Sequence, residues 1–114
     1  MKLTLLTLQA HERGKIYKVA INGRTVSILL TFHALERIAK WQLTEQAVLR
    51  SLLYPEEVLR GHRDRFIAHR RSGRHIVRAV YEYEDDLPVV VTVYHPLARR
   101  YFQGEGIYEN HILS

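Results

Sequence analysis

The sequence predicts a single α+β domain, in which two short helices pack on a curved antiparallel sheet with an extra β-hairpin at the N-terminus. Three observations favour this fold class. Residues 16–21 and 24–30 are rich in β-formers and flank Asn22-Gly23, a dipeptide typical of two-residue hairpin turns. Apolar residues recur at helical spacing within segment 31–53, and they alternate with polar residues within segment 65–95.

Two helices are predicted in the first half of the chain. Thr31 is a good N-cap for the first, which ends near Trp41. Thr44 starts the second helix, and Tyr54-Pro55 ends it because the residue before a proline disfavours the α-helical backbone. The next residues, 55–59, are predicted to add one further helical turn.

The sheet is predicted from three strands that short turns join into an antiparallel meander, at residues 65–71, 74–84 and 88–95. A further short strand is expected at residues 3–8, before the hairpin. The length of 114 residues is typical of one domain. Within residues 1–114 we expect a core at 31–95, N-terminal strands at 1–30 and a tail at 96–114.

Composition excludes several kinds of site. The chain has no cysteine, so it forms neither disulfides nor thiolate metal sites. His62 and Asp64 are spaced for metal binding but lack an obvious third ligand, so we expect no metal and no cofactor. No apolar run approaches the roughly 20 residues that span a bilayer, and no signal peptide is recognisable. We therefore expect a cytoplasmic protein without a membrane partner.

Positive charge is concentrated in one segment. The net charge is +5, and seven arginines lie between Arg60 and Arg78 against one acidic residue, Asp64. Clustered arginine is typical of proteins that bind phosphate groups, so RNA is the expected partner. The alternative is a solvated pair of strands whose arginines only keep the protein soluble.

Alternation along the predicted strands assigns side chains to two faces of the sheet. The face expected against the helices carries Phe66, Ala68, Val77, Ala79, Tyr81, Tyr83, Val89, Val91 and Val93. The opposite, open face then displays Arg65, His69, Arg71, Arg78, Thr92 and Tyr94. A register shift of one residue exchanges the two faces, so this assignment depends on the register.

The open face suits both binding and metal-free cleavage of RNA. Arginine binds phosphate through two hydrogen bonds, and a tyrosine ring can stack on an unpaired base. In cleavage, a base removes the proton of the 2′-hydroxyl group while cations stabilise charge on the phosphate. The candidate base is His69 or Tyr94, and the candidate cations are Arg65 and Arg78. The alternative is that these are strand residues without a catalytic role.

The first predicted helix carries a second candidate catalytic pair. His33 and Arg37 are four residues apart, so they share one face of the helix beside its apolar stripe. The helix dipole disfavours the charged form of His33 in the first turn, which suits a neutral base. The alternative is that both residues tie the helix to the sheet. Further candidates for RNA binding are Arg63, Arg70, Arg71 and Arg74.

Six ordered segments resemble a family of domains of unknown function that carries the number 4258. The segments are residues 32–37, 43–48, 54–58, 65–68, 78–81 and 91–94. The first reads Phe32-His33-Ala34-Leu35-Glu36-Arg37, which is similar to the HALERM opening of the family's first helix. The resemblance covers residues 31–95 and leaves the N-terminal hairpin and the tail outside.

That family is similar to RelE- and BrnT-type toxins, small ribonucleases that act without a metal and have two helices on a curved antiparallel sheet. The resemblance implies a toxin-like endoribonuclease that a cognate antitoxin protein neutralises. By position, it marks His33, Arg37, Arg65, Arg78 and Tyr94 as site residues. Two other functions stay open. One is a non-catalytic module that binds RNA or protein, and the other is a structural subunit.

The structural subunit would form a homodimer or larger oligomer. Its contacts would come from the edge of the sheet or from the aromatic residues of the tail, which are Tyr101, Phe102 and Tyr108.

Overall fold

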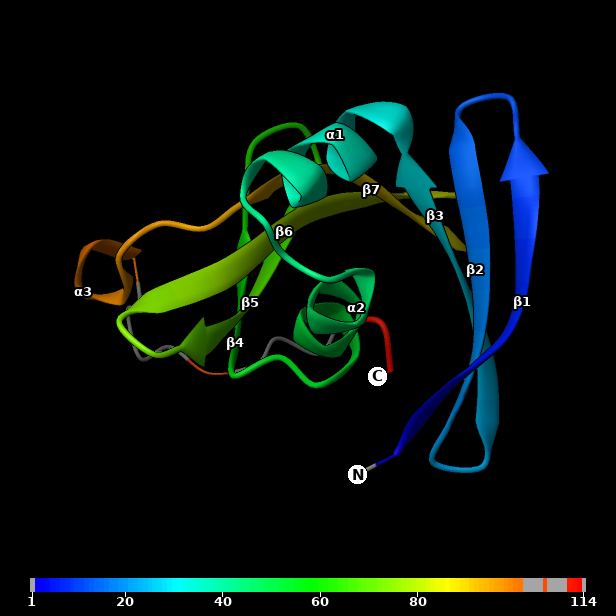
Figure 1. The fold of residues 1–114 in the computed structure, drawn as a ribbon, viewed down its shortest axis with the longest axis horizontal. Coiled ribbons are helices and arrows are strands. Elements are labelled where there is room, and N and C mark those ends of the chain that lie inside the picture. Colours follow the sequence, from blue (N-terminus) through cyan, green and yellow to red (C-terminus); the bar gives the residue numbers. More distant parts are fainter. Residues whose placement is uncertain (1, 102–105, 107–110, 114) are drawn as a thin grey trace.

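The computed structural model describes residues 2–101, 106 and 111–113, which form a seven-stranded mixed sheet with three short helices (Figure 1). The strands are β1 Leu3–His11, β2 Gly14–Ile21, β3 Arg24–Thr31, β4 Glu57–Arg60, β5 Phe66–Ser72, β6 His75–Glu84 and β7 Leu87–Tyr94. The helices are α1 Phe32–Lys40, α2 Glu45–Leu53 and α3 Ala98–Tyr101. Among the described residues, no helix has the length and apolar character needed to cross a membrane.

The predicted fold class, two short helices on a curved antiparallel sheet with an extra hairpin, is wrong. The sheet is mixed, because β3 and β7 pair in parallel at Leu29–Val89 and Leu30–Val90. The strand order is β1-β2-β3-β7-β6-β5-β4, so the N-terminal strands form one side of the same sheet. A third helix, α3, follows β7. Local turn signals predict antiparallel neighbours, whereas a parallel pair joins strands that lie far apart in the sequence.

The strands at the centre of the sheet are buried on both faces. Leu29 and Leu30 are at most 1% exposed, and Val89 and Val90 are not exposed at all. Buried backbone groups need hydrogen-bond partners, and the parallel pairing supplies them where β3 meets β7. The continuous apolar run Ile28-Leu29-Leu30 is the sequence signal of such an interior strand.

Both predicted helices begin at their predicted caps. The hydroxyl groups of Thr31 and Thr44 accept hydrogen bonds from the backbone N–H three residues later, at 3.2 Å and 3.0 Å. Helix α1 lies beside β7, where Nε1 of Trp41 donates to the carbonyl of Val93 at 3.2 Å. Helix α2 lies in the hollow of the curved sheet (Figure 1), and its Leu52 is fully buried.

The core lies between the sheet and helices α1 and α2. The inward orientation is confirmed for the core residues Phe66, Ala68, Val77, Ala79, Tyr81 and Val93. It is wrong for the first half of β7, where the register shifts so that Val80 pairs with Thr92 but Tyr81 pairs with Val90. Val91 is therefore the extra residue of a β-bulge, and Val90 packs in the core in its place.

Residues 57–60 form the edge strand β4 rather than the further helical turn predicted at 55–59. β4 pairs with β5 in antiparallel register from Glu57–His69 to Arg60–Phe66. This strand brings Glu57 to the face of the sheet opposite α1 and α2, where the candidate site lies.

Candidate nucleic-acid interface

A row of polar side chains crosses the open face of the sheet. The register pairs Glu57 of β4 with His69 of β5, His69 with Arg78 of β6, and Arg78 with Tyr94 of β7. Residues directly opposite each other on neighbouring strands point to the same face, so these four residues form one line, which we call the polar row. The structure thus brings together His69, Arg78 and Tyr94, three of the residues expected on this face.

Glu57 and His69 form a buried pair at the β4 end of the polar row. Neither side chain is exposed, and Nε2 of His69 lies 2.7 Å from Oε1 of Glu57. Burial lowers the pKa of His69, although the hydrogen bond to Glu57 opposes this effect. Nε2 of His69 and Oε1 of Glu57 thus share a buried hydrogen bond. Because His69 is fully buried, it cannot contact a ligand on the open face.

Arg78 and Tyr94 form the accessible end of the polar row. Arg78 is half-buried, and Tyr94 is 45% exposed. Burial lowers the pKa of Arg78, and the nearby Tyr101, Tyr94 and Glu57 oppose the shift. Nη1 of Arg78 is buried and has no hydrogen-bond partner among the residues that the structure describes. A buried donor without an acceptor costs free energy, so this guanidinium is suited to a ligand that brings an acceptor.

A cavity of about 340 Å³ opens on this face, and we call it the cationic cavity. Its lining residues are Gly61, His62, Arg63, Arg65, Ile67, Arg78, Val80 and Tyr94. Nη2 of Arg65 lies 3.8 Å from a carboxylate oxygen of Glu82, while its buried Nε has no partner within the described ranges. Two lining residues of the cavity, Arg65 and Arg78, thus each have a buried donor without a partner among the described residues.

The turn between β4 and β5 brings His62 and Arg63 to the cationic cavity. It is closed by hydrogen bonds from the Gly61 N–H to the Arg65 carbonyl, at 2.8 Å, and from the Arg65 N–H to the His62 carbonyl, at 3.2 Å. Arg63 and Asp64 both have left-handed backbones, with φ of 58° and 59°. The sequence pattern indicates His62 only as a candidate metal ligand. In the part of the chain that the structure describes, no three His, Asp or Glu side chains are grouped to hold a metal ion.

A second cavity, of about 260 Å³, adjoins the first and shares Arg78 and Tyr94 with it. Its other lining residues are Pro96 and Tyr101, and we call it the aromatic cavity. The guanidinium carbon of Arg78 lies 4.7 Å from the centre of the Tyr101 ring. Phe102 and Tyr108, which were predicted with Tyr101 as an oligomer surface, lie outside the described residues.

His33 lies at the margin of the open face. It is exposed, and its Nε2 lies 3.1 Å from Oγ1 of Thr92 in β7. Arg37 is half-buried one turn later in α1. Neither residue lines the cationic or the aromatic cavity, so the structure separates the α1 pair from the arginines of the sheet.

Arg71 is engaged by a neighbouring carboxylate. Its Nε and Nη2 donate to Oε2 of Glu56 at 3.1 Å and 2.8 Å. These bonds hold the pKa of Glu56 below its ordinary value. Among the four arginines predicted to bind RNA outside the catalytic set, Arg63 is the one that lines the cationic cavity.

Arg70 and Arg74 lie away from that cavity. Arg70 pairs with Val77, a core residue, so its side chain belongs to the helix side of the sheet. Its Nη1 donates to the carbonyl of Tyr54. Arg74 is exposed in the turn between β5 and β6.

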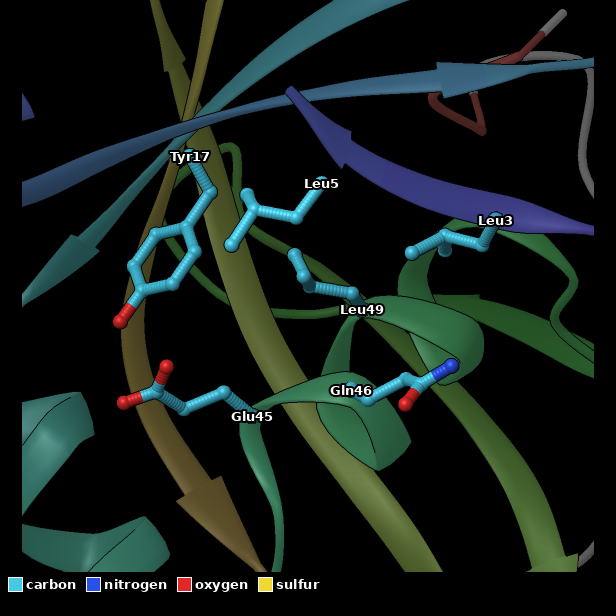
Figure 2. Close-up of a pocket in the computed structure, with 6 residues that line it drawn as sticks. All are labelled: Leu3, Leu5, Tyr17, Glu45, Gln46 and Leu49. Atoms are coloured by element: carbon cyan, nitrogen blue, oxygen red, sulfur yellow. The ribbon is translucent and has the colours of Figure 1, made fainter. Parts of the chain in front are cut away.

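A cavity of about 250 Å³ on the helix side of the sheet has a different character. It is lined by Leu3, Leu5, Tyr17, Glu45, Gln46 and Leu49 (Figure 2). Figure 2 shows the ring of Tyr17 reaching toward the carboxylate of Glu45. Burial raises the pKa of Tyr17, and Glu45 adds to the shift. A mostly apolar cavity that carries the Glu45 carboxylate disfavours phosphate, so this cavity is a poor candidate for a nucleic-acid interface.

Comparison with protein families identifies the central part of the chain. The model of a family described as a domain of unknown function, DUF4258, matches residues 30–95. The match covers more than half of the 114 residues and spans α1, α2 and β4 to β7. Comparison with curated proteins and with solved structures gives no match. The matched range contains the cationic cavity and excludes Tyr101 of the aromatic cavity.

Proposed function

The chain belongs to the family described as a domain of unknown function, DUF4258, and we propose that it is an endoribonuclease that cleaves RNA in the cationic cavity without a metal ion. Kinship with RelE- and BrnT-type toxins is part of this proposal. The observation that carries it is the cationic cavity, in which His62 lies with Arg65, Arg78 and Tyr94.

The proposed reaction is an internal transesterification with His62 as general base. The imidazole removes the proton of the 2′-hydroxyl group, and the 2′-oxygen bonds to the adjacent phosphorus while the bond to the 5′-oxygen breaks. Tyr94 donates its phenolic proton to the departing 5′-oxygen, and solvent then takes a proton from His62 and returns one to Tyr94. The products are a 2′,3′-cyclic phosphate and a 5′-hydroxyl end, so atoms and protons balance.

The arginines of the cavity stabilise the charge that develops on the phosphate. Arg65 and Arg78 both line the cavity, and each carries a buried nitrogen without a partner among the described residues, so both have hydrogen-bonding capacity left to donate to phosphate oxygens. The Arg78 side chain stands beside the buried Glu57–His69 pair in the polar row. Packing against a buried pair fixes its position, and fixed donors are the source of electrostatic catalysis.

The test uses purified protein and an end-labelled single-stranded RNA in buffer with EDTA. We expect fragments with 2′,3′-cyclic phosphate and 5′-hydroxyl ends, and no cleavage where the residue 5′ to the scissile phosphate is 2′-deoxy. Folded protein that leaves the RNA intact in both EDTA and magnesium contradicts the proposal. Fragments with 3′-hydroxyl ends contradict the proposed mechanism.

A second candidate function is a non-catalytic RNA-binding module. The burial of His69 favours it, because that residue is removed from the set of accessible bases. A binding module predicts affinity that falls steeply with salt and RNA that stays intact. The predicted antitoxin partner, which would cover the cationic cavity of a toxin, and the predicted homodimer remain predictions.

A further inference from the structure

The aromatic cavity differs in chemistry from the cationic cavity beside it. Tyr94, Tyr101 and Pro96 line it with flat apolar surfaces, and Arg78 is the one charged residue in its lining among those that the structure describes. Tyr94 and Tyr101 come from separate elements, β7 and α3, and are 45% and 40% exposed. Such a cavity suits a flat aromatic ligand that also carries a hydrogen-bond acceptor.

The contact between Arg78 and Tyr101 leaves the guanidinium incompletely satisfied. A cation–π contact at 4.7 Å gives the N–H groups no oxygen or nitrogen acceptor. Nη1 of Arg78 is buried without a partner within the described part of the chain. If packing alone explained this arrangement, a buried charged donor would be left unpaired at a cost. A ligand with an acceptor at its edge removes that cost.

We propose that the aromatic cavity binds one unpaired nucleobase of single-stranded RNA, stacked on Tyr94 and Tyr101, with Arg78 donating to an acceptor at the edge of the base. This inference rests on the proposed function and names its substrate class. The base would lie next to the scissile phosphate, because the two cavities share Arg78 and Tyr94. Bases in a duplex are stacked inside the helix and cannot enter, so paired RNA is excluded.

Tyr101 gives this site a component outside the matched family range. The DUF4258 match ends at residue 95, whereas Pro96 and Tyr101 follow it. The described residues that line the cationic cavity all lie within the matched range. Phosphate binding and cleavage therefore depend on the family domain, and selection for single strands depends on the segment that follows.

The experiment measures stacking directly, with short single-stranded oligonucleotides in which 2-aminopurine occupies each position in turn. Complete 2′-O-methylation prevents cleavage during the titration. We expect fluorescence to be quenched on saturation at one position, and the single strand to bind about 5- to 150-fold more tightly than a duplex of equal length. Tyr101→Leu should abolish the quenching and lower the affinity by a similar factor, whereas Tyr101→Phe should retain both.

Arg50 of α2 provides a matched control, because it is exposed on the helix side of the sheet. Arg50→Ala should bind and quench like the parent. Equal affinity for single strand and duplex without quenching, in protein that cleaves RNA, overturns the base site alone. Quenching that requires Tyr101, in protein that cleaves no RNA, supports the base site and overturns the proposed cleavage. Failure to bind RNA at low salt overturns both.

Discussion

His69 of β5 and Glu57 of β4 are direct cross-strand neighbours whose buried side chains meet with Nε2 and Oε1 2.7 Å apart. Arg78 follows His69 in the same row and reaches the cationic cavity. Glu57 and His69 thus form a buried pair beside Arg78, a catalytic candidate. The pair links the edge of the sheet to the site, and its protonation state is tied to the stability of the fold.

Acid should weaken the fold through His69. Burial lowers the pKa of His69 from its ordinary 6.5. The unfolded chain therefore binds a proton at this residue more tightly than the folded chain does. The stability from this residue is present above pH 6.5 and is lost as the pH falls toward the folded-state pKa. Urea denaturation at pH 7.5, 6.5 and 5.5 measures the effect.

His69→Gln provides the control, since glutamine can donate to Glu57 but does not titrate. The variant should lose less unfolding free energy than the parent between pH 7.5 and 5.5. Parallel losses in the two proteins would show that other groups cause the pH dependence.

Two valine substitutions in β7 test the bulge. Val93 belongs to the buried core cluster, whereas Val91 is half-buried at the bulge. Val93→Ala should lower the free energy of unfolding by about 1–3 kcal/mol, because it leaves a cavity in the core. Val91→Ala removes the same atoms and should cost less than about 1 kcal/mol. An equal loss of unfolding free energy in the two variants would mean that Val91 is buried like Val93, as the regular alternation predicts, and would contradict the bulge.

Arg63 should contribute to RNA affinity through charge alone. It is exposed where it lines the cationic cavity. Arg63→Ala should reduce the slope of log affinity against log salt by about 0.7 for a single strand, the effect of one lost phosphate contact. Filter binding at salt concentrations from about 50 to 200 mM gives the slope. If the slope for Arg63→Ala equals that of the parent, Arg63 does not contact an RNA phosphate.

Arg71 should matter little for RNA, although it is exposed. Its bonds to Glu56 occupy Nε and Nη2, and the side chain of Arg71 is 57% exposed. Arg71→Ala should change the free energy of unfolding by at most about 1 kcal/mol, as expected for a solvent-exposed ion pair. It should lower RNA affinity less than Arg65→Ala does in the same assay. A larger loss of RNA affinity for Arg71→Ala than for Arg65→Ala would move the interface toward the β5–β6 turn.

Local signals were sufficient for most elements. Thr31 and Thr44 predict the starts of α1 and α2 correctly. The predicted hairpin forms at Asn22-Gly23, and both turn residues have left-handed backbones. Alternation placed Arg78 and Tyr94 on one face because β6 and the last part of β7 pair without interruption. The sequence cue for these features lies within a few residues of the feature itself.

Long-range features escaped prediction for the opposite reason. The parallel pairing of Leu30 with Val90 joins segments whose contact no turn signal marks. The bulge at Val91 reverses the alternation within a run of valines, where either face is equally apolar. His62 reaches the cationic cavity only because β4 forms and the next turn is tight, so its partners were not apparent from its neighbours in sequence.

The most direct test of the central claim is the single-turnover rate at which the protein cleaves one end-labelled single-stranded RNA in EDTA. The parent, Arg78→Ala and Arg50→Ala should be purified in parallel, so that a contaminating nuclease would appear in all three. We predict that Arg78→Ala folds like the parent and cleaves about 10²- to 10³-fold more slowly, while Arg50→Ala cleaves at the parent's rate. Equal cleavage by all three proteins, or none by the folded parent, would contradict an RNA-cleaving site at the cationic cavity.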